Sequence, residues 1–217
     1  MISVKLGKDS TATALRAALI VLERGGIIAY PTETFYGLGA KFDLHESLRR
    51  LCTLKRRPRD KAMPVIIGKR ELLPLIASEP WLRDLPASVE LLMDRFWPGP
   101  LTLLLPAREG LSGYLTADTG MIGVRIPGES FALSLARRAG FPITATSANL
   151  SGLPPADDIE TVKGYFVKGI DFVIEGGRTP GGLPSTIVDA TGERITIVRE
   201  GAIGKNELGI PVYNDSL

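Results

Sequence analysis

Residues 25–40 read GGIIAYPTETFYGLGA, and the fold that we expect is built around this stretch. Its two leading glycines end a preceding helix, and the apolar run 27–30 predicts a short buried strand. Pro31 ends that strand and begins a turn that carries Thr32, Glu33 and Thr34. Hydroxyl and carboxylate groups at a strand end can bind an amino or hydroxyl group, but the same residues are common in plain turns and helix caps. Composition alone leaves both interpretations open.

Helical and strand patterns alternate along the rest of the chain. Helices are predicted over 10–24, 44–55, 69–77, 87–96 and 131–139. Further strands are predicted over 64–67, 101–105, 122–126, 143–146, 172–174, 186–188 and 195–198. The closing strands are joined by short turns, which indicates antiparallel pairing in part of the sheet. We therefore expect an α/β domain of α+β-like character, with one twisted, mixed parallel and antiparallel sheet flanked by helices.

Length and composition set the broad class. The 217 residues suit a single domain over 1–217, with a core over about 10–203 and a short C-terminal tail over 204–217. One cysteine and one histidine exclude an internal disulfide and a Cys/His metal cluster. Signal-peptide features and an apolar run of membrane-spanning length are missing from the sequence, so we expect a cytoplasmic protein without membrane contact. Walker A, G-x-G-x-x-G and G-x-S-x-G patterns are missing too, which argues against a P-loop nucleotidase or a classical hydrolase.

Residues 55–61, KRRPRDK, concentrate five cationic side chains in a chain whose net charge is only +2. Such a cluster either attracts phosphates or is a solvated basic loop. Lys55 supplies a point charge and Arg57 a bidentate fork, while Pro58 restricts Arg57 to an extended conformation. The pair suits a triphosphate, and we expect it in a solvent-facing loop.

Two other polar segments lie at the ends of predicted strands. Residues 144–152, TATSANLSG, offer the Ser147 hydroxyl, the Asn149 amide and backbone N–H groups that could form an anion-binding concavity, although an ordinary turn is an equal alternative. Ser185 lies where a glycine-rich loop enters a strand, and Arg199 lies where a strand ends. Open α/β sheets bind ligands at strand ends, so these segments predict a concave, basic-rimmed cavity.

Taken in order, these segments resemble the YrdC-like family of threonylcarbamoyl-AMP synthases, in its short single-domain type. The resemblance covers roughly residues 10–203, and the ordered Lys-x-Arg and Ser-x-Asn pairs are its most specific part. The matching segments are GG and YPTETFYGLGA (25–26 and 30–40), KRRP (55–58), FWPGPLT (96–102), VRIP (124–127), SANLSG (147–152), STIVD (185–189) and REG (199–201).

The resemblance implies a reaction and its reactants. L-threonine and bicarbonate or CO₂ would give a carbamate, which would attack the α-phosphate of ATP and release pyrophosphate. Mg²⁺ would accompany ATP, although the sequence shows no carboxylate cage for it. A tRNA-modification partner protein would then transfer the threonylcarbamoyl group to tRNA. Adenylyl transfer needs alignment and charge neutralisation more than a protein nucleophile, which fits a chain without a catalytic triad.

The resemblance also implies ten site residues. The residues on the ATP side are Lys55, Arg57, Ser147, Asn149 and Arg199, and the first four of these would be catalytic. Ser147 and Asn149 would lie across the cleft from the basic loop. Those on the threonine side are Thr34, Arg125, Ala145 and Ser185, and Lys61 would assist with anions.

Three positions depart from the family pattern. Ile66 stands where some relatives have a histidine, so a backbone group or another side chain would contact threonine there. Met121 replaces a common threonine, and Leu153-Pro-Pro-Ala156 replaces a run that is richer in hydroxyls.

Other readings stay open. They are a module that binds tRNA or double-stranded RNA, a divergent paralogue on the same fold, and a carbamoyl-transfer domain of the hydrogenase-maturation type. Loops 55–62 and 176–184 carry the Gly, Pro and charge content of segments that could close over a substrate.

Overall fold

A computed structural model describes residues 2–7, 9–192, 194–209 and 213–214, the last two through their backbone. The expected mixed α/β class is confirmed, but the strands form two sheets where one was expected. Periodicity identifies a strand without identifying its partner, so the division into two sheets could not be read from the sequence. The part of the expected tail at 210–212 and 215–217 lies outside the described residues.

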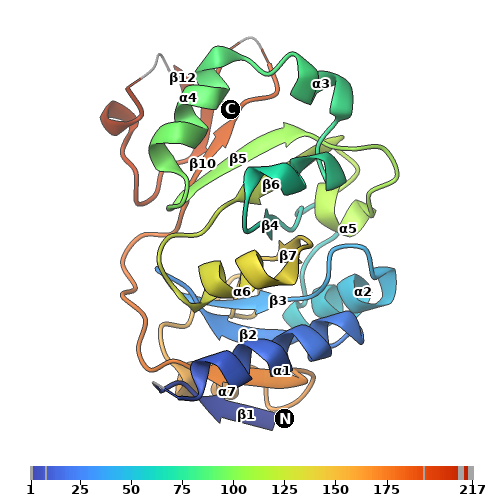
Figure 1. The fold of residues 1–217 in the computed structure, drawn as a ribbon, viewed down its shortest axis with the longest axis vertical. Coiled ribbons are helices and arrows are strands. Elements are labelled where there is room, and N and C mark those ends of the chain that lie inside the picture. The colour runs from blue at the N-terminus through green and yellow to red at the C-terminus, as the bar shows by residue number, and fades with distance from the viewer. Residues whose placement is uncertain (1, 8, 193, 210–212, 215–217) are drawn as a thin grey trace.

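The first sheet has five strands in the order β1, β9, β2, β3 and β8. Their bounds are Ile2–Lys5 for β1, Phe172–Glu175 for β9, Ile28–Pro31 for β2, Tyr36–Gly39 for β3 and Thr146–Ser147 for β8. β9 pairs in parallel with both β1 and β2, whereas β3 pairs antiparallel with β2 and β8. Figure 1 shows this sheet at one end of the long axis.

The second sheet has seven strands in the order β12, β11, β10, β5, β6, β4 and β7. Their bounds are Tyr213–Asn214, Thr196–Arg199, Thr186–Asp189, Leu101–Pro106, Met121–Arg125, Val65–Ile66 and Ile143–Thr144. β5 lies near the middle, parallel to β10 and antiparallel to β6. This sheet occupies the other end of the molecule in Figure 1.

The strand β3 was not predicted, because Gly37 and Gly39 read as turn residues. Both glycines pair with β2 beside the buried ring of Tyr30. A Cβ on Gly39 would lie 2.8 Å from the ring, and one on Gly37 would lie 3.2 Å from it. The glycines therefore make room for an aromatic side chain inside a strand, a role that glycine has where another group approaches closely.

The run predicted as one strand over 143–146 is broken at Ala145. Residues before the break form β7 of the seven-stranded sheet, and residues after it form β8 of the five-stranded sheet. At the break, the Ala145 N–H donates to the Pro64 carbonyl at 2.8 Å. The segment thereby ties the two sheets together.

Helices cover both sheets. The predicted helices correspond to α1 (Thr11–Glu23), α2 (His45–Lys55), α4 (Ala87–Phe96), α6 (Phe131–Ala139) and a 3₁₀ helix η1 (Arg70–Leu75) that contains Pro74. The helices that were not predicted are α3 (Glu79–Arg83), α5 (Gly113–Thr116), α7 (Ile159–Tyr165) and the 3₁₀ helix η2 (Lys205–Glu207), all short. α1 and α6 pack together against β2, and a larger core joins α2, α4 and both sheets. No helix among the described residues has the length and apolar character to cross a membrane.

Candidate functional site

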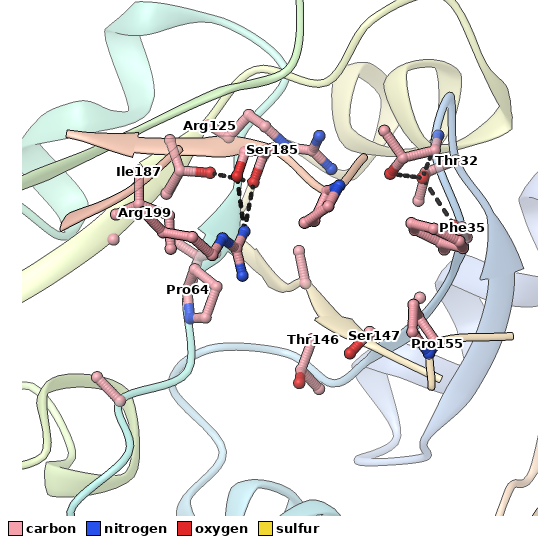
Figure 2. A pocket seen from close by; sticks show the side chains of 18 of the residues that line it. Thr32, Phe35, Pro64, Arg125, Thr146, Ser147, Pro155, Ser185, Ile187 and Arg199 are labelled. Atoms are coloured by element: carbon pink, nitrogen blue, oxygen red, sulfur yellow. Dashed lines mark hydrogen bonds between the residues drawn. The ribbon is translucent and has the colours of Figure 1, made fainter. Parts of the chain in front are cut away.

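A cavity of about 460 Å³ opens between the two sheets. The five-stranded sheet contributes residues from β2, β3, β8 and the turn after β2, and the seven-stranded sheet contributes residues from β4, β5, β6, β10 and β11. This volume is in the range of small-molecule sites. Figure 2 shows Thr32 and Phe35 on one side of it, Arg125, Ser185 and Arg199 on the other, and Ser147 with Pro155 along a third.

Ser185 is held between two strands of the seven-stranded sheet. Its hydroxyl lies 3.0 Å from the Thr102 hydroxyl on β5. Arg199, the last residue of β11, donates through Nη2 to the Ser185 carbonyl at 2.7 Å and to its hydroxyl at 3.3 Å (Figure 2). Burial and, to a smaller extent, the charge of Arg125 lower the pKa of Arg199. Two guanidinium groups thus lie close together on this wall, an arrangement suited to anionic ligands.

The turn after β2 forms the opposite wall. The Thr32 hydroxyl donates to the Phe35 carbonyl at 2.7 Å, accepts from the Thr34 N–H at 3.0 Å and lies 3.1 Å from the Thr34 hydroxyl. These bonds fix the turn and leave hydroxyl groups at the cavity surface (Figure 2). The ligand-binding and turn interpretations of this segment are therefore compatible.

The prediction that Lys55 belongs to a solvent-facing loop is wrong. Lys55 ends α2, is 1% exposed and is not among the residues that line the cavity. Its Nζ donates to the Ser147 carbonyl and to the Asn149 carbonyl, the latter at 2.6 Å. The helix ends at Lys55 as its periodicity predicted, but its last turn directs the ammonium inward, where carbonyl groups satisfy it.

The neighbouring cations have different environments. Arg57 lines the cavity and is held by bonds from Nε to the Lys61 carbonyl at 2.9 Å and from Nη2 to the Ala62 carbonyl at 2.5 Å. Burial lowers the pKa of Arg57. Arg56, Arg59 and Lys61 are exposed and are not among the lining residues, so the expected anion contact of Lys61 is not placed at the cavity.

The segment 147–149 adjoins Lys55 and does not lie across the cleft from it, which corrects that part of the expectation. Ser147 lines the cavity and donates to Asn149 Oδ1 at 2.5 Å. Asn149 is buried behind it, with Nδ2 donating to the carbonyls of Leu150 and Leu153 at 3.0 and 2.6 Å.

Three backbone N–H groups in this segment already have partners, so these three do not contribute to an anion-binding concavity. The N–H groups of Ala148, Asn149 and Ser151 donate to the carbonyls of Tyr36, Ser147 and Lys55. The segment instead turns carbonyl oxygens toward the Lys55 ammonium.

Seven of the ten expected site residues line the cavity. They are Thr34, Arg57, Arg125, Ala145, Ser147, Ser185 and Arg199. Lining residues that sequence reasoning did not single out include Tyr30, Tyr36, Thr102 and Pro155. Thr102 lies in the FWPGPLT segment that carried part of the resemblance, which was the available signal.

The segment 176–181 is tied to the cavity wall. The Tyr36 hydroxyl accepts from the Gly176 N–H at 3.0 Å and donates to the Gly177 carbonyl at 2.7 Å. The Gly181 N–H donates to the Thr34 carbonyl at 2.8 Å. These three bonds make this part of the loop a fixed extension of the wall.

The departures from the family pattern lie in different places. Ile66 is fully buried in the core with α6, and neither it nor Met121 is among the lining residues. Pro155 lines the cavity, and the Ala156 carbonyl accepts from the Tyr36 N–H at 2.9 Å. Pro64 and Val65 are the cavity residues nearest in sequence to Ile66.

Metal ligands are not gathered at this cavity. Its charged lining residues in the described part of the chain are Arg57, Arg125 and Arg199, and no carboxylate is among them. No group of three or more His, Cys, Asp or Glu side chains in the described ranges is arranged to hold a metal ion. The lining therefore does not fit a resident Mg²⁺ held by protein carboxylates.

Comparisons with known proteins agree with this architecture. A model of the Sua5/YciO/YrdC family, described as "Telomere recombination", matches residues 20–201. The chain is 36% identical over 194 residues to the threonylcarbamoyl-AMP synthase of Pyrococcus abyssi, covering 89% of this chain and 56% of that protein. It is 39% identical over 182 residues to that of Escherichia coli O6:H1, covering 83% of this chain and 93% of that protein.

Solved structures are similar as well. The crystal structure of P. abyssi Sua5 complexed with L-threonine superposes with a TM-score of 0.87 and 33% identity, covering 98% of this chain and 62% of that one. E. coli YciO superposes with a TM-score of 0.78 and 25% identity, covering 96% and 98%. The chain thus spans somewhat more than half the length of the archaeal relative and nearly all of the E. coli proteins.

Proposed function

The chain belongs to the Sua5/YciO/YrdC family, and from this premise we propose that it is a threonylcarbamoyl-AMP synthase, an adenylyl (nucleotidyl) transferase that acts on L-threonine, bicarbonate and ATP. The observation that carries the proposal is the cavity between the two sheets, where three arginines and several hydroxyl groups converge. The threonine-bound relative with the same fold supports an amino acid as one of the ligands. We also propose that residues 1–217 act as one domain.

The proposed chemistry needs no protein nucleophile. Bicarbonate takes up a proton and loses water to give CO₂. The threonine ammonium loses one proton, the neutral amine attacks CO₂, and the nitrogen then releases a second proton to solvent to give the carbamate. A carbamate oxygen then attacks the α-phosphorus of ATP, the bond from that phosphorus to the bridging oxygen breaks, and pyrophosphate leaves with the electron pair. The protein's part is to align the reactants and to offset the negative charge that builds up in the transition state.

Residue roles follow from the two walls. Arg57 and Arg199 are the proposed phosphate contacts, because both line the cavity and a guanidinium matches phosphate oxygens bidentately. Arg125 is proposed to receive the threonine carboxylate, and Thr34 with Ser185 to contact its polar groups. The backbone of Ala145 and the Ser147 hydroxyl complete the floor. Lys55 and Asn149 would act indirectly, by holding Ser147.

Magnesium would be brought by the nucleotide. The lining side chains offer it no carboxylate, so phosphate oxygens and water would be its ligands, and no step is assigned to a protein-bound metal. The product would pass to a partner protein that modifies tRNA, and direct contact with tRNA or double-stranded RNA is an additional proposal.

Pyrophosphate release tests the proposal. The purified protein with ATP, threonine and bicarbonate should release pyrophosphate, and omission of threonine should abolish the release. Arg199→Met should raise the KM for ATP at least tenfold, as expected for loss of a charge-assisted contact. Arg83→Met, which removes an exposed ion pair with Glu79 on α3, is the matched control and should behave as wild type.

Other outcomes separate the alternatives. Turnover that does not depend on threonine would contradict the synthase and favour a divergent paralogue. Tight binding of tRNA in gel shifts at moderate salt, without pyrophosphate release under any condition, would favour an RNA-binding module.

A further inference from the structure

Glu33 and Arg125 form the most buried ion pair among the described residues. Glu33 lies in the turn after β2 of one sheet, and Arg125 ends β6 of the other. Arg125 Nη1 donates to Glu33 Oε1 at 2.6 Å, and the two side chains are only 9% and 16% exposed, respectively. The pair therefore joins the two walls of the cavity.

Stability alone does not account for this pair. Removing two charges from water offsets most of their attraction, so a buried ion pair is weak evidence for stabilisation. In addition, Glu33 Oε2 is buried and has no hydrogen-bond partner in the described part of the chain. A buried acceptor without a donor is unfavourable. The carboxylate of Glu33 is thus held in an unfavourable place with Arg125 as its one partner there.

The surroundings place Glu33 behind Arg125. Arg125 lines the cavity, whereas Glu33 is not among the lining residues. The Glu33 side chain packs beside Gly128, where a Cβ would lie 3.2 Å from Glu33 Cγ, so the segment after β6 leaves little room for it to move. Among the described residues, Glu33 takes the one hydrogen bond recorded for the Arg125 side chain. The remaining N–H groups of Arg125 are available to a ligand.

The proximity of Arg199 explains why orientation matters. Arg125 is close enough to lower the pKa of Arg199, so the two cations share one wall. An Arg125 without a fixed anchor could turn toward the phosphates that Arg199 is proposed to bind. The Glu33 carboxylate offsets one of the two charges and holds one arm of the guanidinium in place.

We propose that Glu33 is a positioning residue for the amino-acid substrate, which directs Arg125 toward the ligand carboxylate and away from the nucleotide. The inference rests on the proposed function, because it assumes that Arg125 receives that carboxylate. Glu33 itself is not proposed to touch the substrate. Its effect is selectivity for a ligand that carries a carboxylate.

The test is Glu33→Gln, which keeps the size and one acceptor but removes the charge. The KM for threonine should rise about tenfold or more, as for a lost charge-assisted hydrogen bond, while the KM for ATP should stay within about twofold. Calorimetry should give the Kd of threonine and the Kd of threoninol, which lacks the carboxylate. The ratio of the threoninol Kd to the threonine Kd should be smaller in this variant than in wild type. Glu33→Asp, which restores the charge, should recover part of the wild-type ratio.

The test has a matched control variant, and the outcomes that would contradict the positioning role differ from those that would contradict the proposed function. Glu79→Gln breaks the exposed Glu79–Arg83 pair and should change neither KM. The positioning role would be overturned if wild type is active and the ratio of the threoninol Kd to the threonine Kd is the same in Glu33→Gln as in wild type. An equal loss of affinity for threonine, threoninol and ATP would show that Glu33 has a structural role only. If Glu33→Gln fails to fold by circular dichroism, Glu33→Asp carries the comparison. A wild type that is inactive with all three substrates would refute the proposed function instead, and the calorimetric ratio would still be measured.

Discussion

Lys55 combines a charged head group with almost complete burial. Its Nζ is surrounded by the carbonyls of Ser147 and Asn149 and, at 3.5 Å, by Asn149 Oδ1. Burial and, secondarily, the charge of Arg57 lower the pKa of Lys55 to about 7. Lys55 and the Ser-x-Asn pair are therefore parts of one hydrogen-bonded unit, in which the lysine supports the serine that faces the cavity. Arg57 is held separately, by the carbonyls of Lys61 and Ala62.

This environment predicts a pH dependence of stability. Between about pH 7 and 10.5 the unfolded chain keeps a proton on Lys55 that the folded chain releases. The unfolded state therefore binds more protons, and the Lys55 contribution to the free energy of unfolding rises with pH across this window.

Urea unfolding of wild type and Lys55→Met at pH 7 and 9.5 checks this. From pH 7 to 9.5, the free energy of unfolding of wild type should increase by roughly 1–3 kcal/mol relative to that of the variant, since one pKa unit corresponds to about 1.4 kcal/mol. Other titrating groups cancel in the difference between the two proteins. Identical pH dependence in both would show that Lys55 does not release its proton on folding.

Thr102 gives a second prediction at the residue scale. Thr102→Val removes the hydroxyl that lies 3.0 Å from Ser185 while keeping the shape of the side chain. Ser185 would then be oriented by Arg199 alone, so the KM for threonine should rise about threefold to tenfold, in line with one neutral hydrogen bond. Steady-state kinetics measure this, with Thr53→Val on the exposed face of α2 as control. An unchanged KM would mean that Thr102 does not orient Ser185.

At the scale of elements, the approach of α6 to the segment after β4 is set by one glycine, Gly68. A Cβ on Gly68 would lie 2.4 Å from Arg137 Cα and 2.5 Å from the Ala136 carbonyl carbon and oxygen. These are backbone atoms of the helix, so they cannot move aside as a flexible side chain could. The helix can lie this close to the segment after β4 only while position 68 lacks a side chain.

Gly68→Ala should therefore destabilise the fold by about 1–3 kcal/mol, the usual range for overpacking. Gly164→Ala is the matched control, because position 164 lies in α7 and a Cβ there meets nothing within 4 Å. The control should be neutral or slightly stabilising, since alanine favours a helix over glycine. Chemical unfolding of both variants measures the difference, and equal stabilities would contradict the packing argument.

At the scale of the whole molecule, the cavity lies between the two sheets and is lined by both. Each sheet supplies one wall, and the segment around Ala145 passes from one to the other. A ligand that contacts both walls should therefore stabilise the sheets together.

Thermal unfolding tests this. ATP alone or threonine alone, at about 100 times its Kd, should add about 2.7 kcal/mol to the free energy of unfolding and so raise the Tm. Arg199→Met should lose most of the rise in Tm with ATP. The rise with threonine should shrink much less, because Arg199 reaches threonine only through its bonds to Ser185. Loss of both rises in this variant would contradict the assignment of the two ligands to separate arginines.

Much of the local structure could be predicted from the sequence. Helices over 10–24, 44–55, 87–96 and 131–139 follow from apolar periodicity, and they match α1, α2, α4 and α6 closely. β3 was missed because Gly37 and Gly39 have a role only beside the ring of Tyr30. The short helices α3, α5 and α7 were missed because a helix of one or two turns shows too little periodicity.

Ordered motifs and local periodicity were enough to predict the family, the class of fold and seven residues that line the cavity, because both are properties of neighbours along the chain. The division into two sheets, their connection at Ala145 and the inward direction of Lys55 became visible only in the folded molecule. Folding also brought Glu33 to Arg125 across 92 residues. Burial and pairing arise between distant segments, and no pattern within one segment records them.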